Sequence, residues 1–449
     1  MSIDKTQMTP PGGDDRTQAF TPQGQATQMP GGMPTQMGLP AQALTMECVA
    51  GNKYALSTET TRDHVLVSLR SMDIAAGRRA PLNLALVVDR SGSMEGEPLE
   101  YVKRACGYVV DLLEPTDILT IVVFEEQVQV LMPARRVINK QLVKEHINRI
   151  EVGNTTNLYD GIVAGCSQVA AVRAEGYVNR VLAFSDGEPT AGIKDFSSIV
   201  GMVGEQKSRG VTVTVLGFGP EYNEELLAGI ARRSGGNYYY ITRPELIPEV
   251  FRKELEVLMS TVARNLRLKL NLSRWVQVRQ AYGKLPTYGM RTAEVTLTDL
   301  ERGSAQSALW EVQFDPRPAG VYRVAGAELT YDDSVSGRTE KIVHDVVFEF
   351  TPDRQLVEQN ANPAVQREIE VAEASRNLER TVMGMRTQQI APGAAVQELE
   401  RTRMILLQQG KADQAQDVQQ AIDNIKSGGA GAEKTLMGTI YDLDRGKSK

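Results

Sequence analysis

Residues 82–94 read LNLALVVDRSGSM, an almost wholly apolar run that ends in an acid, two serines and a glycine. An apolar run without alternation is typical of a strand that is buried on both faces of a parallel sheet. Asp89, Ser91 and Ser93 follow the end of this strand, and Gly92 permits a tight loop between them. Ligands of open α/β sheets bind at the carboxyl ends of the strands, so these three side chains are candidate ligands.

Residues 81–262 continue the pattern that this strand begins, with short apolar runs separated by helical patterns. Further strands are predicted at ILTIVVF (118–124), RVLAFSDG (180–187) and VTVTVLGFG (211–219). Strands that are buried on both faces and alternate with helices indicate an α/β domain. The sequence therefore predicts a doubly wound, mostly parallel, Rossmann-like sheet.

Two more loops offer oxygen atoms to the same edge of the predicted sheet. One loop is GNTTN (153–157), and the other is SDG (185–187), which follows the third strand. Carboxylate and hydroxyl oxygens are hard donors, which suit Mg²⁺ or Mn²⁺. A cation site built from oxygen is therefore expected where the three loops meet.

Several stretches together resemble the von Willebrand factor type A family, over about residues 81–262. The stretches that carry the resemblance are DRSGSM (89–94), GNTTNLYDG (153–161), FSDG (184–187), VTVLGFG (213–219) and SGGNYYYI (234–241).

The resemblance implies a metal-ion-dependent adhesion site, in which a divalent cation accepts a carboxylate from a partner protein. The family's threonine stands five residues before a glycine; Gly161 assigns that position to Thr156 rather than to Thr155. None of the five ligand positions is substituted, so the site is expected to be intact and to hold Mg²⁺ or Mn²⁺, or else Ca²⁺. The implied metal ligands are Asp89, Ser91, Ser93, Thr156 and Asp186.

Composition excludes several other classes of protein. The 449 residues are enough for two to four domains, and 50 basic against 56 acidic residues give a net charge of −6, which does not favour nucleic acid. Three histidines and three widely spaced cysteines form neither a zinc site nor a disulfide framework. No membrane span or secretory signal is recognised, so the expected location is cytoplasmic.

The sequence favours a protein that is not an enzyme. A Ser–His–Asp hydrolase needs a base beside its serine, but His146 falls in a predicted helix and His64 and His344 fall in predicted strands. No GxSxG elbow and no P-loop occur. A metal-dependent hydrolase that uses the oxygen cluster stays open as an alternative.

The regions that flank the α/β domain are rich in β-strand patterns. Residues 45–80 and 263–352 alternate apolar and polar positions between turn signals, as expected for a β-sandwich with one wet face. We expect one sandwich into which the 81–262 domain is inserted; alternatively, residues 45–80 cap the α/β sheet. Residues 353–427 are predicted to form an α-helical hairpin, with Pro392 and Gly393 between its halves and Gly410 as a candidate break in the second helix.

Both ends of the chain are expected to be flexible. Residues 1–44 are rich in Thr, Gln, Pro, Gly and Met, which predicts disorder, and residues 428–449 begin with several glycines. A flexible threonine is accessible to kinases, and a forkhead-associated domain could then read the phosphate. A phosphothreonine-regulated scaffold is therefore an alternative function, and a plain solubilising tail is the simpler interpretation. The candidate phosphorylation sites are Thr6, Thr17, Thr27, Thr35 and Thr435.

The resemblance also implies what kind of partner to expect. Many bacterial members of the family are partners of larger assemblies, including AAA+ ATPases, so an AAA+ ATPase is one expected partner. A weaker resemblance of the whole layout is to calcium-activated chloride channel regulator-like proteins, which join such a domain to β-rich segments. The missing export signal argues against a channel-related role.

Overall fold

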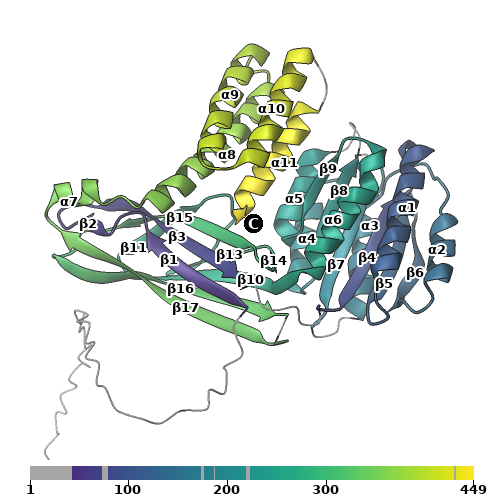
Figure 1. Cartoon of the computed structure of the whole chain (residues 1–449), viewed down its shortest axis with the longest axis horizontal. Coiled ribbons are helices and arrows are strands. Elements are labelled where there is room, and N and C mark those ends of the chain that lie inside the picture. The colour runs from purple at the N-terminus through teal and green to yellow at the C-terminus, as the bar shows by residue number, and fades with distance from the viewer. Residues whose placement is uncertain are drawn as a thin grey trace, which may run out of the picture.

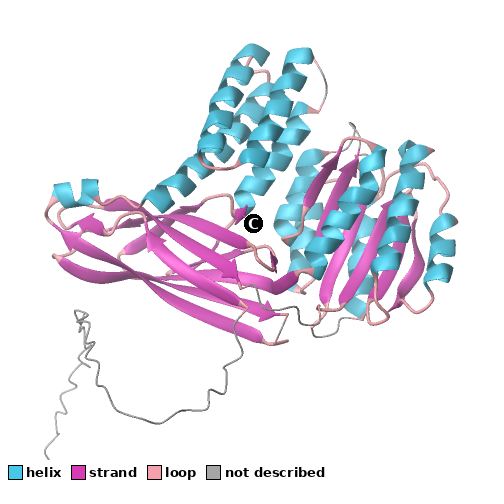
Figure 2. Ribbon diagram, viewed as in Figure 1, coloured by secondary structure: helices cyan, strands magenta, loops and turns pink. Residues whose placement is uncertain are grey.

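The computed structural model describes residues 43–72, 79–172, 176–186, 188–218, 223–334, 336–428 and 431–448 (Figure 1). It contains an α/β domain, a β-sandwich and a group of C-terminal helices (Figure 2). The predicted disordered segment 1–44 lies outside the described residues except for its last two positions, and Thr6, Thr17, Thr27 and Thr35 lie outside them as well.

The α/β domain is built on a six-stranded sheet with β4 (Leu82–Asp89) near its centre, and all eight residues of β4 are buried. Every neighbouring pair is parallel except β5 with β6, which confirms the predicted doubly wound, mostly parallel sheet. The other strands are β5 (Ile118–Phe124), β6 (Val128–Arg136), β7 (Val178–Ser185), β8 (Thr212–Phe218) and β9 (Tyr238–Ile241), and the order is β6-β5-β4-β7-β8-β9.

Helices cover both faces of this sheet. Alternate residues of β4 belong to two different cores: Leu84 and Leu86 pack on one face, and Ala85 and Val87 on the other. This is why β4 is apolar at successive positions. The first face is covered by α1 (Glu97–Leu112), α2 (Lys140–Asn148) and α6 (Ile247–Met259), and the second by α3 (Leu158–Ala171), α4 (Phe196–Ser208) and α5 (Glu224–Ser234).

The β-sandwich is assembled from both sides of the α/β domain in the sequence. β3 (Thr61–Ser71) pairs with β15 (Ala305–Phe314) in a continuous antiparallel register, so residues 45–80 and 263–352 share a sheet. Residues 45–80 therefore do not merely cap the α/β sheet. The first sheet also holds β1 (Leu44–Ala50), β11 (Val276–Ala281) and β18 (Lys447–Ser448).

The second sheet of the sandwich packs on the first around Trp310, which is fully buried. Its strands, in sheet order, are β12 (Thr287–Gly289), β13 (Thr292–Thr296), β10 (Thr261–Leu272), β16 (Gly320–Asp333), β17 (Thr339–Thr351) and β2 (Tyr54–Leu56), with β14 (Leu300–Glu301) beside β10.

The structure confirms C-terminal helices, but residues 353–427 hold three long helices rather than the two of the predicted hairpin, and a fourth follows them around the same core. Gly410 and Gly428 adopt left-handed backbone angles, with φ of 74° and 70°, which divides the apolar pattern into separate helices. The short α7 (Arg354–Gln359) precedes the four helices, which are α8 (Pro363–Arg386), α9 (Pro392–Gln408), α10 (Ala412–Ser427) and α11 (Ala432–Arg445).

The expectation of a flexible tail over 428–449 is also wrong for the residues that are described. α11 buries Leu436 and Ile440, four residues apart on one face, in the core of the C-terminal helices, and it buries Tyr441 from another side in a core of the α/β domain. Thr435 is half-buried in α11, and its hydroxyl donates to the Gly431 carbonyl at 3.2 Å. It is therefore not the freely accessible threonine that the sequence suggested.

α11 contacts the α/β domain as well as its neighbouring helices. The Tyr441 ring packs edge-on against Tyr238 of β9 at 6.2 Å, and its hydroxyl donates to the Gly236 carbonyl. Arg232 of α5 pairs with Asp444 at 3.1 Å. β18 follows α11 directly and pairs with β15 of the sandwich. The C-terminal segment therefore joins the three parts of the molecule (Figure 1).

Replacing Tyr441 with Phe should weaken the attachment of α11 to the α/β domain, because it removes the hydroxyl but keeps the ring that fills the core. The Tyr441 side chain is 2% exposed, so the change leaves the Gly236 carbonyl without this buried donor. The cost of about 1–1.5 kcal/mol should speed amide exchange across α11 roughly tenfold, as hydrogen-exchange mass spectrometry would record. Tyr177→Phe is the control, because its hydroxyl donates to the Thr116 carbonyl. Equal amide exchange across α11 in both variants would contradict the role of the Tyr441 hydroxyl in attaching α11 to the α/β domain.

Candidate metal centre

Asp89 is the last residue of β4 and is fully buried. Its Oδ1 accepts from the Ser91 backbone N–H at 2.9 Å, and its Oδ2 accepts from the Ser185 hydroxyl at 2.7 Å. The first bond closes the turn of the DRSGSM loop, and the second crosses to the end of β7. These two bonds fix the carboxylate at the carboxyl edge of the sheet.

The two serines of the loop lead from Asp89 to the third loop. Ser91 Oγ and Ser93 Oγ are 3.1 Å apart, and Ser93 Oγ donates to Asp186 Oδ1 at 2.8 Å. Met94 is completely buried and ends the short 3₁₀ turn Gly92–Met94, which anchors the loop. Asp89, Ser91, Ser93 and Asp186, all expected as ligands, are therefore linked side by side.

The loop that carries Thr156 lies against the first loop. The Gly92 N–H donates to the Asn154 carbonyl at 3.2 Å. Thr156 is 4% exposed, and its backbone N–H donates to Thr190 Oγ1 at 2.9 Å. Asn157 then caps α3, accepting at its side chain from the Asp160 N–H. These bonds fix the backbone on both sides of Thr156 and hold its loop against the loop that carries Ser91 and Ser93.

Two residues outside the predicted ligand set support the cluster: Ser185, which belongs to the SDG loop that the sequence placed at this edge, and Thr190, which the sequence did not indicate. Ser185 stands beside the expected ligand Asp186 and orients Asp89 through its hydroxyl. Thr190 supports the backbone of Thr156 from the loop after β7. The position of Ser185 directly before Asp186 was the one feature of the sequence that pointed to it. Thr190 reaches Thr156 only because of the path that its loop takes in the folded chain.

The electrostatics of the cluster favour a cation. Burial is the main cause that raises the pKa of Asp89 to about 7; hydrogen bonds from Ser185 and Ser91 oppose the shift, and the negative charge of Asp186 adds a smaller increase. The nearest arginine in the sequence, Arg90, pairs with Glu125 at 3.3 Å. Two neighbouring buried carboxylates thus repel each other, and a bound cation would relieve this repulsion.

The donor set fits a hard divalent cation. Two carboxylates and three hydroxyls are the oxygen ligands that Mg²⁺ and Mn²⁺ prefer. Within the described part of the chain, no group of three or more His, Cys, Asp or Glu residues could hold a metal. Any metal held here would therefore depend on the hydroxyls of Ser91, Ser93 and Thr156 as much as on the two acids.

The three histidines lie in the elements expected for them. His64 of β3 contacts the Tyr282 hydroxyl at 3.1 Å, His146 lies in α2, and His344 of β17 contacts the Asp345 carbonyl at 3.0 Å. None of the helices in the described ranges is long and apolar enough to cross a membrane.

Comparison with known proteins identifies the domain. The family profile of the von Willebrand factor type A domain matches residues 83–253. The protein sll0103 of Synechocystis is 30% identical over 272 residues, which cover 58% of this chain and 64% of that protein. The chain therefore spans somewhat less than two thirds of this relative's length.

Two solved structures are similar to this chain over a larger part of its length than the family profile or the sequence relative covers. A von Willebrand factor type A protein from Catenulispora acidiphila superposes with a TM-score of 0.72 at 16% identity, over 84% of this chain and 89% of that one. The ArnB paralog VWA2 from Sulfolobus acidocaldarius gives a TM-score of 0.62 at 16% identity, over 89% and 98%. Residues 83–253 of this chain therefore form a von Willebrand factor type A domain, a family that commonly mediates protein–protein interaction and is generally non-enzymatic.

Proposed function

We propose that the chain binds a partner protein by holding a divalent cation that accepts an Asp or Glu side chain of that partner. The observation that carries this proposal is the linked cluster of Asp89, Ser91, Ser93 and Asp186 at the carboxyl edge of the sheet. Thr156 completes the ligand set from the neighbouring loop. The cation is Mg²⁺ or Mn²⁺.

The charge of the ligand set explains why a partner carboxylate would bind. Only two of the five ligands are anionic, so they no more than balance the charge of the cation, and the three neutral hydroxyls leave it electrophilic enough to attract a further acid. Ser93 and Gly92 are exposed, so a partner can approach the loop from solvent. Asp89 is fully buried, so a cation held by this cluster would be open to solvent and to a partner only from the side of Ser93 and Gly92.

The rest of the molecule presents this domain in a defined orientation. Arg180 of β7 and Asp299 of the sandwich form a buried ion pair at 2.8 Å. Arg264 of β10 donates to the Tyr177 carbonyl of the α/β domain. We therefore assign the sandwich and the helices the task of orienting the domain and adding contact surface. The proposed setting is the cytoplasm, with an acidic protein, such as an AAA+ ATPase, as the partner and without nucleic acid.

Affinity capture from native lysate tests the proposal directly. The full chain is used as bait in a buffer that contains either millimolar Mg²⁺ or EDTA, and the eluted proteins are quantified by mass spectrometry. We expect at least one protein to be enriched about tenfold or more in Mg²⁺, which corresponds to about 1.4 kcal/mol. The same protein should be lost with Ser93→Ala bait. Identical eluates in Mg²⁺ and EDTA would refute the metal bridge.

A further inference from the structure

A small cavity of about 120 Å³ lies where the α/β domain, the sandwich and the C-terminal helices meet, and we call it the junction cavity. Its wall is formed by the end of α5, the loop between β11 and β12, the β12–β13 hairpin, β15 and α11. Cavities between domains are frequent binding sites. The charged residues that line it are the bases Arg232, Arg233, Lys284 and Arg445 and the acids Glu294 and Asp444.

The junction cavity is separate from the candidate metal centre. α5 runs from the carboxyl end of β8 to the amino end of β9, so its last residues lie at the opposite edge of the sheet from Asp89. Gly235, which ends α5 with a left-handed φ of 72°, is part of the cavity wall. A ligand in the cavity would therefore act independently of a bound cation.

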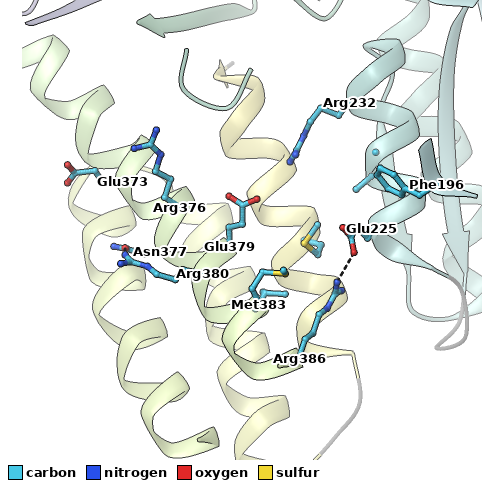
Figure 3. Close-up of a pocket in the computed structure, with 14 residues that line it drawn as sticks. Phe196, Glu225, Arg232, Glu373, Arg376, Asn377, Glu379, Arg380, Met383 and Arg386 are labelled. Atoms are coloured by element: carbon cyan, nitrogen blue, oxygen red, sulfur yellow. Dashed lines mark hydrogen bonds and ion pairs between the residues drawn. The ribbon is translucent and has the colours of Figure 1, made fainter. Parts of the chain in front are cut away.

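A larger groove of about 790 Å³ lies beside the junction cavity, between α5 and α8, and Arg232 lines both (Figure 3). The bases in and beside this groove already have partners within the chain. The pairs are Arg376 with Gln280, Arg380 with Asn377, Arg386 with Glu225 and Glu433, and Lys434 with Glu224. The groove therefore offers fewer unused donors than the smaller cavity.

The arginines of the junction cavity are only partly used by the protein itself. Arg232 pairs with Asp444 at 3.1 Å, whereas Arg233 is exposed and forms no ion pair with any residue that the structure describes. The guanidinium of Arg445 is 3.7 Å from the Asp442 carboxylate, and its Nε has no hydrogen-bond partner among the described residues. Because each guanidinium carries five N–H donors, these side chains keep donors for a ligand.

Two half-buried lysines at the cavity also lack a carboxylate partner within the described ranges. Lys284 Nζ donates to the Asp444 backbone carbonyl at 3.0 Å. Lys207 stands behind the wall, because a Cβ added to Gly235 would lie 3.5 Å from its Nζ, and this Nζ donates to Thr212 Oγ1 at 3.1 Å. Burial lowers the pKa of Lys284 to about 8 and also lowers the pKa of Lys207. A nearby anion would stabilise both ammonium groups.

Positive charge exceeds negative charge at the cavity. Besides the two acids, the carboxyl ends of α5 and α11 face this region, and each contributes about half a negative charge. The four lining bases outweigh these contributions, and Lys207 adds to the excess from behind Gly235. The cavity therefore favours an anion over a cation or an apolar ligand.

We propose that the junction cavity binds one phosphate-type oxyanion, either as free phosphate or as the phosphate group of a small metabolite. Arg232 and Arg233 of the α/β domain, Lys284 of the sandwich and Arg445 of α11 donate to its oxygens. Guanidinium groups suit this role, because their parallel N–H donors match the spacing of phosphate oxygens. The bound anion thus joins all three parts of the molecule and fixes the orientation of the α/β domain.

Titration calorimetry with inorganic phosphate on the full chain tests the site. The buffer contains EDTA and chloride at constant ionic strength, so that neither a bound metal nor general salt contributes. We expect one saturable site and a thermal midpoint that rises with phosphate concentration. Glycerol phosphate distinguishes the two sources: similar affinity means that the cavity accepts a phosphate group on a larger molecule, and weaker affinity restricts it to the free ion. No saturable binding at tens of millimolar phosphate would overturn the proposal.

Two variants place the ligand in the cavity. Arg233→Gln and Lys284→Gln should each weaken phosphate binding about tenfold or more, because each removes a charge-assisted donor. Arg136→Gln at the end of β6 is the matched control for Arg233, since Arg136 is also exposed and forms no ion pair within the described ranges. It should leave the affinity within about twofold. Unchanged affinity in both cavity variants, or an equal loss in Arg136→Gln, would contradict this placement.

Hydrogen exchange then shows whether the anion joins the parts of the molecule. Phosphate should slow amide exchange in α11 and in the β12–β13 hairpin of the unmodified chain, but not in α2, which lies on the other face of the α/β sheet. Arg233→Gln should lose this protection while it keeps the exchange rates of the phosphate-free protein. Protection that is unchanged by saturating phosphate would refute the joining role.

Discussion

Replacing Asp89 with Ala is expected to weaken Mn²⁺ binding at least ~100-fold, measured by isothermal titration calorimetry on the full chain. Asp89 is the fully buried acid of the cluster, and it also orients the Ser91 turn through a bond of 2.9 Å. Its removal therefore deletes one of two anionic ligands and releases the loop that carries two hydroxyl ligands. Loss of the cation should in turn abolish the Mg²⁺-dependent capture of the partner.

Two further variants separate loss of the site from loss of the fold. Asp111→Ala removes an exposed carboxylate of α1 that pairs with Lys144, and it should leave Mn²⁺ affinity within about twofold. Asp89→Asn keeps the shape and the acceptor oxygen of the side chain, yet it should bind the cation almost as poorly as Asp89→Ala. Thermal unfolding in EDTA checks that each variant remains folded. Mn²⁺ affinity that is unchanged in folded Asp89→Ala would contradict the proposed site.

Replacing Glu254 with Ala should cost about 3–4 kcal/mol of unfolding free energy. Glu254 is a fully buried residue of α6. Its carboxylate accepts from the Thr214 hydroxyl of β8 at 2.7 Å, from the Tyr239 hydroxyl of β9 at 2.9 Å, and from the Asn237 side-chain amide. Alanine leaves three donors, of which Thr214 and Asn237 are buried, without this acceptor and opens a cavity between α6 and the sheet.

The effect should be visible as weaker protection of α6 and β9 in hydrogen exchange, together with a lower thermal midpoint of the domain. Glu256→Ala on the same helix is the matched control, because Glu256 is exposed and pairs with Arg252 one turn away. That variant should change stability by no more than about 0.5 kcal/mol. A cost below about 1 kcal/mol for Glu254→Ala would mean that the three donors find other partners, and that α6 is held by apolar packing alone.

The α/β domain could be predicted because the patterns that indicate its strands and candidate ligands each lie within a short stretch of sequence. The apolar run of β4 and the acid and serines that follow it lie within 13 consecutive residues, and parallel strands bring such loops to one edge. Ser185 and Thr190, by contrast, act through bonds to residues far away in the sequence. No spacing rule connects them to Asp89 or Thr156, so only the folded loops reveal their role.

The C-terminal errors have a different cause. Glycines near position 430 suggested a flexible end, but Gly428 ends α10 and Gly431 precedes α11, and α11 is stabilised by burying Leu436, Ile440 and Tyr441. The partner surface for Tyr441 is formed by β9 and Gly236, about 200 residues earlier in the chain. A helix whose apolar face is covered by a distant domain cannot be distinguished locally from a polar tail.

The amino-acid sequence alone determined the type of sheet and the oxygen character of the candidate metal centre, because periodicity and residue type control burial and ligand chemistry over short distances, whereas the pairing of β3 with β15 was needed to join residues 45–80 to the sandwich. The tertiary structure decided which of these side chains meet: the link from Ser91 through Ser93 to Asp186, the attachment of α6 through Glu254, and the seating of Glu433 and Lys434 between α5 and α8. Such contacts join residues far apart in the chain, and they exist only when packing of the whole molecule has brought their elements together.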